Sequence, residues 1–236
     1  MSLWGDVLDV VFPERCVACD VLLSGPGVYF CEECAPEVEA LEGGCAVCAE
    51  PGVGQGLCER CRRKKPMFRL ASAPLVHSGA VARAIQRFKY ENHPELARPL
   101  GALLVSGAAP FLKTAPTAVV PIPLHAARYR ERGYDQTALL AVEVARLTGF
   151  ALRDDALGRV RATTRQVGQT DEEREANVAG AFEAPGNVRG ARLLLIDDVL
   201  TTGATANEAA RVLLKGGAEE VQVLTLARAV RLTPHG

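Results

Sequence analysis

The sequence predicts an α/β protein, with a central parallel sheet flanked by helices, preceded by a small cysteine-rich domain. Short apolar runs typical of strands buried in a parallel sheet share the region after residue 66 with helix-length segments. All eight cysteines lie between positions 16 and 61. A chain of 236 residues can hold a core domain of about 150 to 170 residues and a further module. We therefore expect one domain at 1–66 and a larger one at 67–236.

The cysteines form four Cys-x-x-Cys pairs, with 11 residues between the first two pairs and 9 between the last two. The pairs are Cys16 with Cys19, Cys31 with Cys34, Cys45 with Cys48, and Cys58 with Cys61. This spacing is that of zinc ribbons, in which each pair turns two thiolates toward a tetrahedral metal. A disulfide scaffold is the competing interpretation and needs an oxidising compartment. Redox chemistry would not require four copies.

We expect two structural zinc ions, since eight thiolates leave no open coordination position. Sequential pairing gives one zinc to the first four cysteines and another to the last four, and crossed pairings stay open. Few large apolar residues accompany the cysteines, so metal would supply most of the folding energy of this region.

Charge and hydropathy limit the functional classes. The 27 basic and 28 acidic residues nearly cancel, which gives no general argument for nucleic-acid binding. The run 62–66 is basic, and it is either a solvated linker or a contact for a nucleic-acid backbone. No apolar stretch approaches the roughly 20 residues that span a membrane. The N-terminus lacks a basic start and an export-type cleavage site, so we expect a cytoplasmic protein.

Several elements follow along the second domain. Residues 80–90 have the apolar spacing of a helix and end at Lys89 and Tyr90, and 95–105 predicts a second, packing helix. A buried strand broken by two prolines is expected at 118–123. The arginine-rich run 128–136 follows it, and arginine suits bidentate phosphate recognition.

Two further segments complete this part of the chain. Residues 136–148 carry too many large apolar residues for a surface helix, so we expect this helix against the sheet. Residues 159–177 are polar and almost without core-forming side chains. They predict a long loop, either a functional lid, which we favour, or a disordered segment.

Residues 193–205 carry the strongest signal for chemistry. An apolar run at 193–196 predicts a buried strand, which places Asp197 and Asp198 at its carboxyl end, where open α/β sheets bind ligands. A turn of small and hydroxyl side chains and a helix at 205–215 follow. Backbone N–H groups at such a helix start bind phosphate. Two carboxylates beside a phosphate would bind sugar hydroxyls or a ligand-borne cation; a capped strand-to-helix turn is the purely structural alternative.

This string resembles, position for position, the phosphoribosyl pyrophosphate (PRPP) motif of type I phosphoribosyltransferases. The resemblance implies that Asp197 and Asp198 contact the ribose 2′- and 3′-hydroxyls, and that Mg²⁺ binds with PRPP through pyrophosphate and ribose oxygens. It also implies a phosphate-binding segment that wraps the 5′-phosphate. That segment comprises Val199, Leu200, Thr201, Thr202, Gly203, Ala204 and Thr205.

The combination of motifs resembles the ComF/GntX family more narrowly. The motifs are the cysteine pairs, Phe88-Lys89-Tyr90, the run Arg132 to Gln136, and Gln166 with Arg174 and Asn177 ahead of Ala181-Phe182. The resemblance implies an amidophosphoribosyltransferase-like catalytic fold and a link to DNA uptake in naturally competent bacteria. Lys89 would lie at the pyrophosphate, and Arg130, Arg132, Gln166 and Arg174 would line the pyrophosphate and flexible-loop side.

The expected function is transfer of a phosphoribosyl group from PRPP, or from a related sugar phosphate, to an acceptor that the sequence does not identify. Asp197, Asp198, Lys89 and Arg132 are the expected catalytic residues. The alternative is a non-catalytic PRPP or nucleotide sensor or scaffold whose ribbon binds single-stranded DNA or a competence helicase. An aromatic content of 5% and an acidic ribbon speak against a stacking platform for single strands and favour a protein partner.

Overall fold

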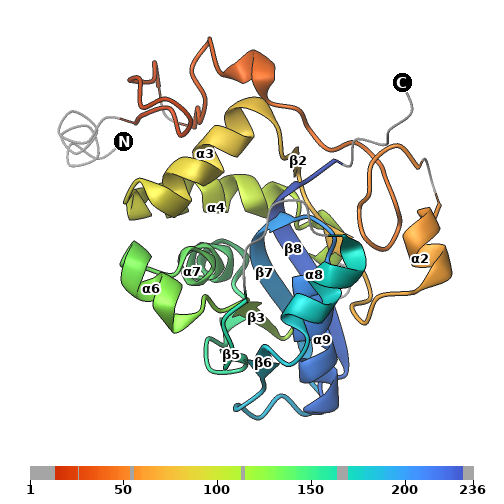
Figure 1. The fold of residues 1–236 in the computed structure, drawn as a ribbon. Helices are drawn as coiled ribbons and strands as arrows, with labels where there is room; N and C mark the ends of the chain where they lie inside the picture. The colour runs from red at the N-terminus through yellow and green to blue at the C-terminus, as the bar shows by residue number, and fades with distance from the viewer. Residues whose placement is uncertain (1–13, 26, 54–55, 113–114, 164–169, 231–236) are drawn as a thin grey trace.

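A six-stranded parallel sheet forms the centre of the molecule in the computed structural model (Figure 1). The structure describes residues 14–25, 27–53, 56–112, 115–163 and 170–230. The sheet has the order β1-β8-β7-β3-β4, and β2 also pairs with β8. Its strands are β1 (Ala71–Ser72), β2 (Leu75–Val76), β3 (Ala118–Pro121), β4 (Ala151–Leu152), β7 (Arg192–Leu200) and β8 (Glu220–Arg228). The two long strands, β7 and β8, therefore lie side by side in the middle.

Helices cover both faces of this sheet, as the alternation of apolar residues along β7 requires. Leu194 and Ile196 pack in the core that contains α3 (Gly79–Tyr90), α4 (Ala97–Ser106) and α7 (Gln136–Thr148). The intervening Leu193 and Leu195 pack in the core that contains α9 (Ala204–Lys215). Figure 1 shows these two helical layers. Because the strand continues to residue 200, the two consecutive aspartates that follow Ile196 alternate between the same two faces.

The remaining described elements are short. They are η1 (Ala35–Glu37), α2 (Glu59–Arg63), η2 (Pro94–Leu96), α5 (Ala109–Leu112), α6 (Ala126–Arg132) and α8 (Asp171–Val178), with the antiparallel pair β5 (Gly158–Arg159) and β6 (Phe182–Glu183). Within the described ranges, no helix has the length and apolar character needed to cross a membrane.

Most expected elements are present with small changes of boundary. The helices expected at 80–90, 136–148 and 205–215 correspond to α3, α7 and α9. The helix expected at 95–105 begins as η2 and continues as α4. These segments combine an apolar stripe with a turn residue after the last helical position, which makes their type and length readable from sequence.

The strand expected at 193–196 was predicted too short. β7 continues to Leu200, paired in register with β8, so both aspartates belong to the strand and do not follow it. The two aspartates made this continuation unrecognisable in the sequence, because a buried strand is normally identified by an uninterrupted apolar run. Asp198 is 5% exposed, a burial that its side-chain partners make tolerable.

The helix expected against the sheet at 136–148, α7, packs there through one side, with Leu140 and Val144 buried and Val142 and Leu147 exposed. One further expectation needs correction. The polar segment expected as a loop over 159–177 is not one throughout, since β5 ends within it and Asp171–Val178 form α8. Thr170 and Glu173 form a capping box at the start of α8, and three acidic residues occupy its first turn. The capping box and the acidic first turn thus stabilise α8, although its sequence has little apolar periodicity.

The cysteine-rich region packs against both cores. Cys16 and Cys34 belong to the core on the α3 side, and the last four cysteines belong to the core on the α9 side. Backbone hydrogen bonds join this region to the edge of the sheet, from Ala71 N to the carbonyl of Val47 (2.7 Å) and from Val76 N to that of Glu39 (2.9 Å).

The contact between α4 and α7 depends on one glycine, which yields a prediction. A Cβ at Gly101 would lie 2.5 Å from Glu143 Cβ. Gly101→Ala therefore forces the helices apart, and we expect the free energy of unfolding to fall by about 1–3 kcal/mol in urea titrations. Arg98→Ala, at an exposed site on the same helix, is the control and should change stability by less than about 0.5 kcal/mol. Equal effects of the two substitutions would contradict this account.

Candidate functional site

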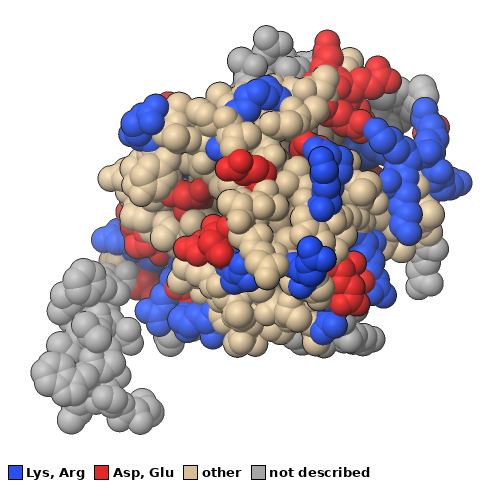
Figure 2. Space-filling model, turned by 90° about the horizontal axis from the view of Figure 1, so that it is seen from below, with Lys and Arg blue, Asp and Glu red and all other residues tan. Residues whose placement is uncertain are grey.

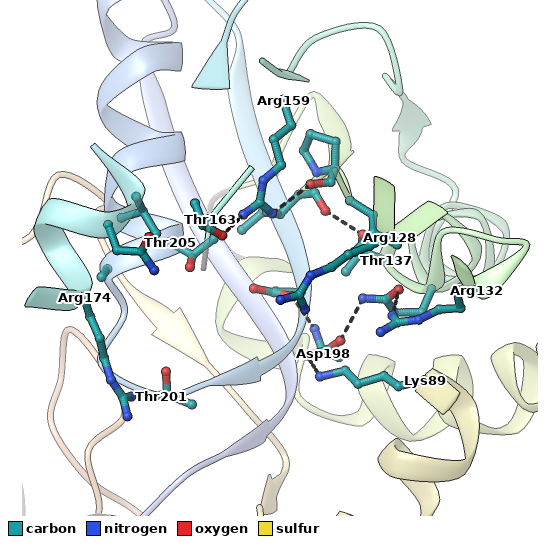
Figure 3. Close-up of a pocket in the computed structure, with 18 of the residues that line it drawn as sticks. Lys89, Arg128, Arg132, Thr137, Arg159, Thr163, Arg174, Asp198, Thr201 and Thr205 are labelled. Atoms are coloured by element: carbon teal, nitrogen blue, oxygen red, sulfur yellow. Dashed lines mark hydrogen bonds and ion pairs between the residues drawn. The ribbon is translucent and has the colours of Figure 1, made fainter. Parts of the chain in front are cut away.

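A cavity of about 440 Å³ lies at the carboxyl ends of β3 and β7 (Figure 3). Strand β7 contributes Asp197 and Asp198, and the segment after it contributes Thr201, Thr202, Ala204 and Thr205. Basic side chains come from four other elements, with Lys89 from α3, Arg128 and Arg132 from α6, Arg159 from β5 and Arg174 from α8. The cavity therefore has two carboxylates on its β7 wall and cations around them.

Asp198 is the best-compensated charge of the cavity. Lys89 Nζ lies 2.7 Å from its Oδ1, and Gln136 Nε2 donates to its Oδ2 at 3.2 Å. Gln136 in turn accepts a hydrogen bond from Arg132. Three residues from α3, α6 and α7 therefore hold this carboxylate in one orientation.

Asp197 is in a different electrostatic state. Burial, together with the charge of the neighbouring Asp198, raises its pKa from 3.8 to about 7. Lys89 and Arg159 act in the opposite direction without restoring the ordinary value. Without ligand, the pair therefore holds a proton over much of the acid range, and a cationic or hydroxyl-bearing ligand would favour full ionisation.

The run that includes Tyr134 and Asp135 fixes the wall that carries Lys89. The Tyr134 hydroxyl donates to the carbonyl of Phe88, the residue before Lys89. Asp135 caps α7 and also accepts from Leu124 N at 2.7 Å, on the segment that follows β3. These hydrogen bonds join α3, α7 and the end of β3 into one rigid support.

The phosphate-binding segment forms a turn followed by α9, as its sequence predicts. Gly203 has a φ of +81°, a conformation that favours glycine, and Ala204 N donates to Thr202 Oγ1 at 3.2 Å. Thr201 is exposed at the cavity, and Arg174 extends toward it in Figure 3. A helix start, hydroxyl groups and an arginine side chain are groups that bind anions in proteins.

The structure does not bring every predicted residue into the cavity. Val199, Leu200 and Gly203 are not among its lining residues, and Leu200 is buried in the core. Arg130 lines an adjoining cavity of about 500 Å³ that shares Lys89, Tyr90, Arg128 and Arg132 with the first. Gln166 lies outside the described residues.

Two arginines of the cavity were not selected from the sequence. Arg159 donates to the carbonyl of Pro123 at 3.3 Å and to Thr163 Oγ1 at 2.5 Å, and its guanidinium lies over the ring of Phe182. Its buried Nε has no hydrogen-bond partner among the described residues, and burial lowers its pKa. Arg128 lies between the two cavities. Both arginines occur in runs dense in basic residues, where sequence gives no reason to prefer one.

The eight cysteines form two clusters of four, grouped as sequential pairing predicts, with no disulfide among them. Within each cluster the sulfur atoms lie within 4.8 Å of one another, as ligands of one tetrahedral metal must. Burial raises the pKa of the Cys45 thiol, but hydrogen bonds from backbone N–H groups, first that of Cys58, bring it down to about 6. Both clusters therefore fit a structural zinc ion.

The chain is similar to known proteins over most of its length. Two protein-family models match the chain, a double zinc ribbon domain at residues 7–64 and a phosphoribosyl transferase domain at residues 138–234. The DNA utilization protein YhgH of Salmonella typhimurium is 30% identical over 92% of this chain and 97% of its own length. Competence protein F of Haemophilus influenzae is also 30% identical, over 92% of this chain and 98% of its own length.

Among solved structures, a glutamine PRPP amidotransferase from B. subtilis aligns with 62% of this chain and 28% of its own, at 23% identity and a TM-score of 0.38. The parallel sheet and the family match together show a phosphoribosyltransferase fold behind a double zinc ribbon.

The raised pKa of Asp197 predicts an unusual stability effect. Between about pH 4 and 7 the folded state keeps a proton that the unfolded chain has lost, so stability falls as pH rises through this range. Asp197→Asn removes that titration, and we expect it to stabilise the ligand-free protein above pH 7 by about 1–3 kcal/mol and to flatten the pH profile.

Urea titrations from pH 4 to 8 measure this effect. The exposed Asp155 is the control, because Arg153 lowers its pKa and Asp155→Asn should therefore give no stabilisation above pH 7. An Asp197→Asn protein less stable than wild type at pH 8 would contradict the proposed titration.

The clusters predict two independent zinc sites. Wild-type protein should contain about two zinc ions per chain by metal analysis, and Cys19→Ser about one. Cys19 is exposed, so its replacement leaves the buried second cluster intact. A Cys19→Ser protein that retained both ions would show that Cys19 is not a ligand.

Proposed function

Because the chain belongs to the ComF family, together with proteins named competence protein F and DNA utilization protein YhgH, we propose that it binds PRPP and transfers the phosphoribosyl group during DNA uptake. The observation that carries this proposal is the charge arrangement of the cavity, with an anion site at each end and two carboxylates between them. PRPP has the matching order of phosphate, ribose hydroxyls and pyrophosphate. We also propose a cytoplasmic location, where thiols stay reduced for metal binding.

The two ends differ in chemistry. The turn at 201–205, the start of α9 and Arg174 form the end suited to the 5′-phosphate. Lys89, Arg128 and Arg132 form the end suited to the pyrophosphate, where several positive charges can stabilise a leaving group. In Figure 3, Thr201 and Arg174 lie on one side of Asp198, and Lys89 and Arg132 on the other.

Ligand binding would rearrange the existing ion pair. Without ligand, Lys89 is bound to Asp198. A pyrophosphate group would attract Lys89, and the ribose hydroxyls would then donate to the carboxylates. Mg²⁺, bound with PRPP, would neutralise pyrophosphate charge. Lys89 would then stabilise the negative charge of the departing pyrophosphate, while Gln136 keeps Asp198 in place.

Transfer at the ribose C1 needs little acid–base chemistry, because the leaving group is already a good one. The side chains would hold ligand and acceptor in line, exclude water and stabilise the departing charge. No histidine is among the described residues that line the cavity. His125, the N-cap of α6, accepts a hydrogen bond from Ala127 N at 3.2 Å.

A second candidate function is a PRPP sensor or scaffold that acts through a protein partner. Three large apolar side chains in the segment of the first cysteine cluster are exposed, those of Val21, Leu22 and Val28. An apolar surface in an acidic region suits a protein partner better than a nucleic-acid backbone. Turnover separates the two functions, since a sensor binds PRPP without releasing pyrophosphate.

Titration calorimetry with PRPP, in the presence and absence of Mg²⁺, tests the proposal. Wild-type protein should bind in a Mg²⁺-dependent manner. Asp197→Asn/Asp198→Asn should bind at least about 100-fold more weakly, because each substitution replaces a carboxylate oxygen that would accept from a ribose hydroxyl with an amide donor. The chain offers a matched control in Asp154→Asn/Asp155→Asn, an exposed Asp-Asp pair outside the cavity.

Absence of PRPP binding to zinc-loaded wild-type protein would end the proposal. Equal binding by the cavity variant and its control would contradict the role of the carboxylates. Pyrophosphate release in the presence of nucleobases, nucleotides or single-stranded DNA would then identify the acceptor.

A further inference from the structure

Arg228, at the carboxyl end of β8, joins the second cysteine cluster to the phosphate-binding turn. It is fully buried. Its Nη1 donates to the carbonyls of Leu200 (2.7 Å) and Thr201 (2.5 Å), and its Nε donates to the carbonyl of Cys48 (3.2 Å). Its Nη2 donates to the Glu50 carboxylate, which balances its charge. One guanidinium therefore holds together a cluster residue, the last residue of β7 and the first residue of the turn.

A second arginine makes the same connection from the other half of the cluster. Arg60, in α2, donates through Nη1 to the carbonyl of Thr202. Its Nη2 lies 3.5 Å from Glu50, and its Nη1 lies 3.9 Å from Asp171 at the start of α8. Arg60 and Glu50 thus form one network with Arg228 beneath the turn.

The positions of these residues in the sequence tie the network to the metal site. Glu50 follows Cys48 by two residues, and Arg60 lies between Cys58 and Cys61. Both Cys-x-x-Cys pairs of the second cluster therefore carry one member of the network. A tetrahedral metal that fixes the four sulfur atoms also fixes the backbone from which Glu50 and Arg60 extend.

The hydrogen bonds determine how the turn presents its donors. In a trans peptide the C=O and the following N–H point in opposite directions. Arg228 and Arg60 bind the carbonyls of residues 200, 201 and 202. The N–H groups of Thr201, Thr202 and Gly203 are therefore directed away from the two arginines. This fixes in advance the donors on which an anion site depends.

We propose that Arg228 and Arg60 are positioning residues that, through Glu50 and the second cysteine cluster, hold the turn at 201–203 in its phosphate-binding conformation. This inference rests on the proposed function, since the ligand of the turn is the PRPP 5′-phosphate. It assigns the second zinc site a role in the cavity that the first does not share. Neither arginine lines the main cavity, so neither acts by touching the ligand.

The first cluster supplies a matched control. Arg83 on α3 forms an ion pair with Glu37 at 2.7 Å and lies 3.6 Å from Cys34 Sγ. It makes a comparable contact with a cysteine cluster, and its hydrogen bonds reach the first ribbon and not the turn. Arg83→Gln should therefore leave the turn unchanged.

The test combines a ligand-free and a ligand-bound readout on the zinc-loaded full chain. ¹⁵N relaxation should show rigid amides at 201–203 in wild type and in Arg83→Gln, with order parameters of about 0.85, and flexible ones in Arg228→Met, below about 0.6. Calorimetry should show about tenfold weaker binding of ribose 5-phosphate to Arg228→Met, as expected for lost charge-assisted hydrogen bonds. Pyrophosphate, which uses the other end of the cavity, should bind within about twofold of wild type.

The outcomes separate this inference from the proposed function. Wild-type protein that binds no ribose 5-phosphate would defeat the function, and the order parameters would still decide whether the arginines hold the turn. Wild-type values for Arg228→Met in both readouts would overturn the inference. Equal losses for ribose 5-phosphate and pyrophosphate would also overturn it, because they would indicate general damage.

Removing a buried arginine can prevent folding, so a second variant is needed. The Arg60 side chain is 25% exposed, and Arg60→Gln removes the bond to the Thr202 carbonyl at lower risk. If Arg228→Met fails to retain zinc, the same measurements on Arg60→Gln decide the question. The expected change is in the same direction and smaller, since one carbonyl is released in place of two.

Discussion

Two adjacent carboxylates at the buried end of a central strand are the constraint on which the site depends. Like charges so close, with little water around them, are unfavourable unless protein groups compensate them. Lys89 and Gln136 compensate Asp198, and Asp197 responds by holding a proton to a higher pH. The surrounding helices are therefore placed by electrostatics as well as by apolar packing. The arrangement favours a ligand that brings hydroxyl donors and its own cation, which is what the proposed substrate supplies.

The support for this pair extends through the fold. Lys89 lies in the last turn of α3, and Gln136 begins α7. Between α6 and α7, Tyr134 hydrogen-bonds to α3 and Asp135 to the segment after β3. Arg60 of the cysteine-rich region and Arg228 of β8 donate to backbone carbonyls at and just before the turn after β7. The amino-terminal region is thus connected to the site, although none of its described residues lines the main cavity.

Sequence alone predicted the parts of this structure that repeat a local pattern. The four long helices follow apolar periodicity, the cysteine clusters follow spacing, and the Asp-Asp turn follows its motif. The extension of β7 to Leu200 and the helix α8 were missed, because polar residues obscure a strand and a cap outweighed weak helical periodicity. Arg159 and Arg228 were missed for a different reason. Their roles come from neighbours distant in sequence, and nothing local distinguishes them from surface arginines.

The place of β8 in the sheet has a consequence for how the molecule assembles. β8 lies between β7 and the short strands β1 and β2, so β1 and β2 cannot pair with the rest of the sheet until this late segment of the chain is present. The second cluster shares its core with β8 and bonds to Arg228. During synthesis the apolar residues around the second cluster therefore stay exposed until β8, more than a hundred residues later in the sequence, has been synthesised. Long-range pairings of this kind slow folding and expose intermediates to aggregation, so early zinc capture by the ribbon would protect the nascent chain.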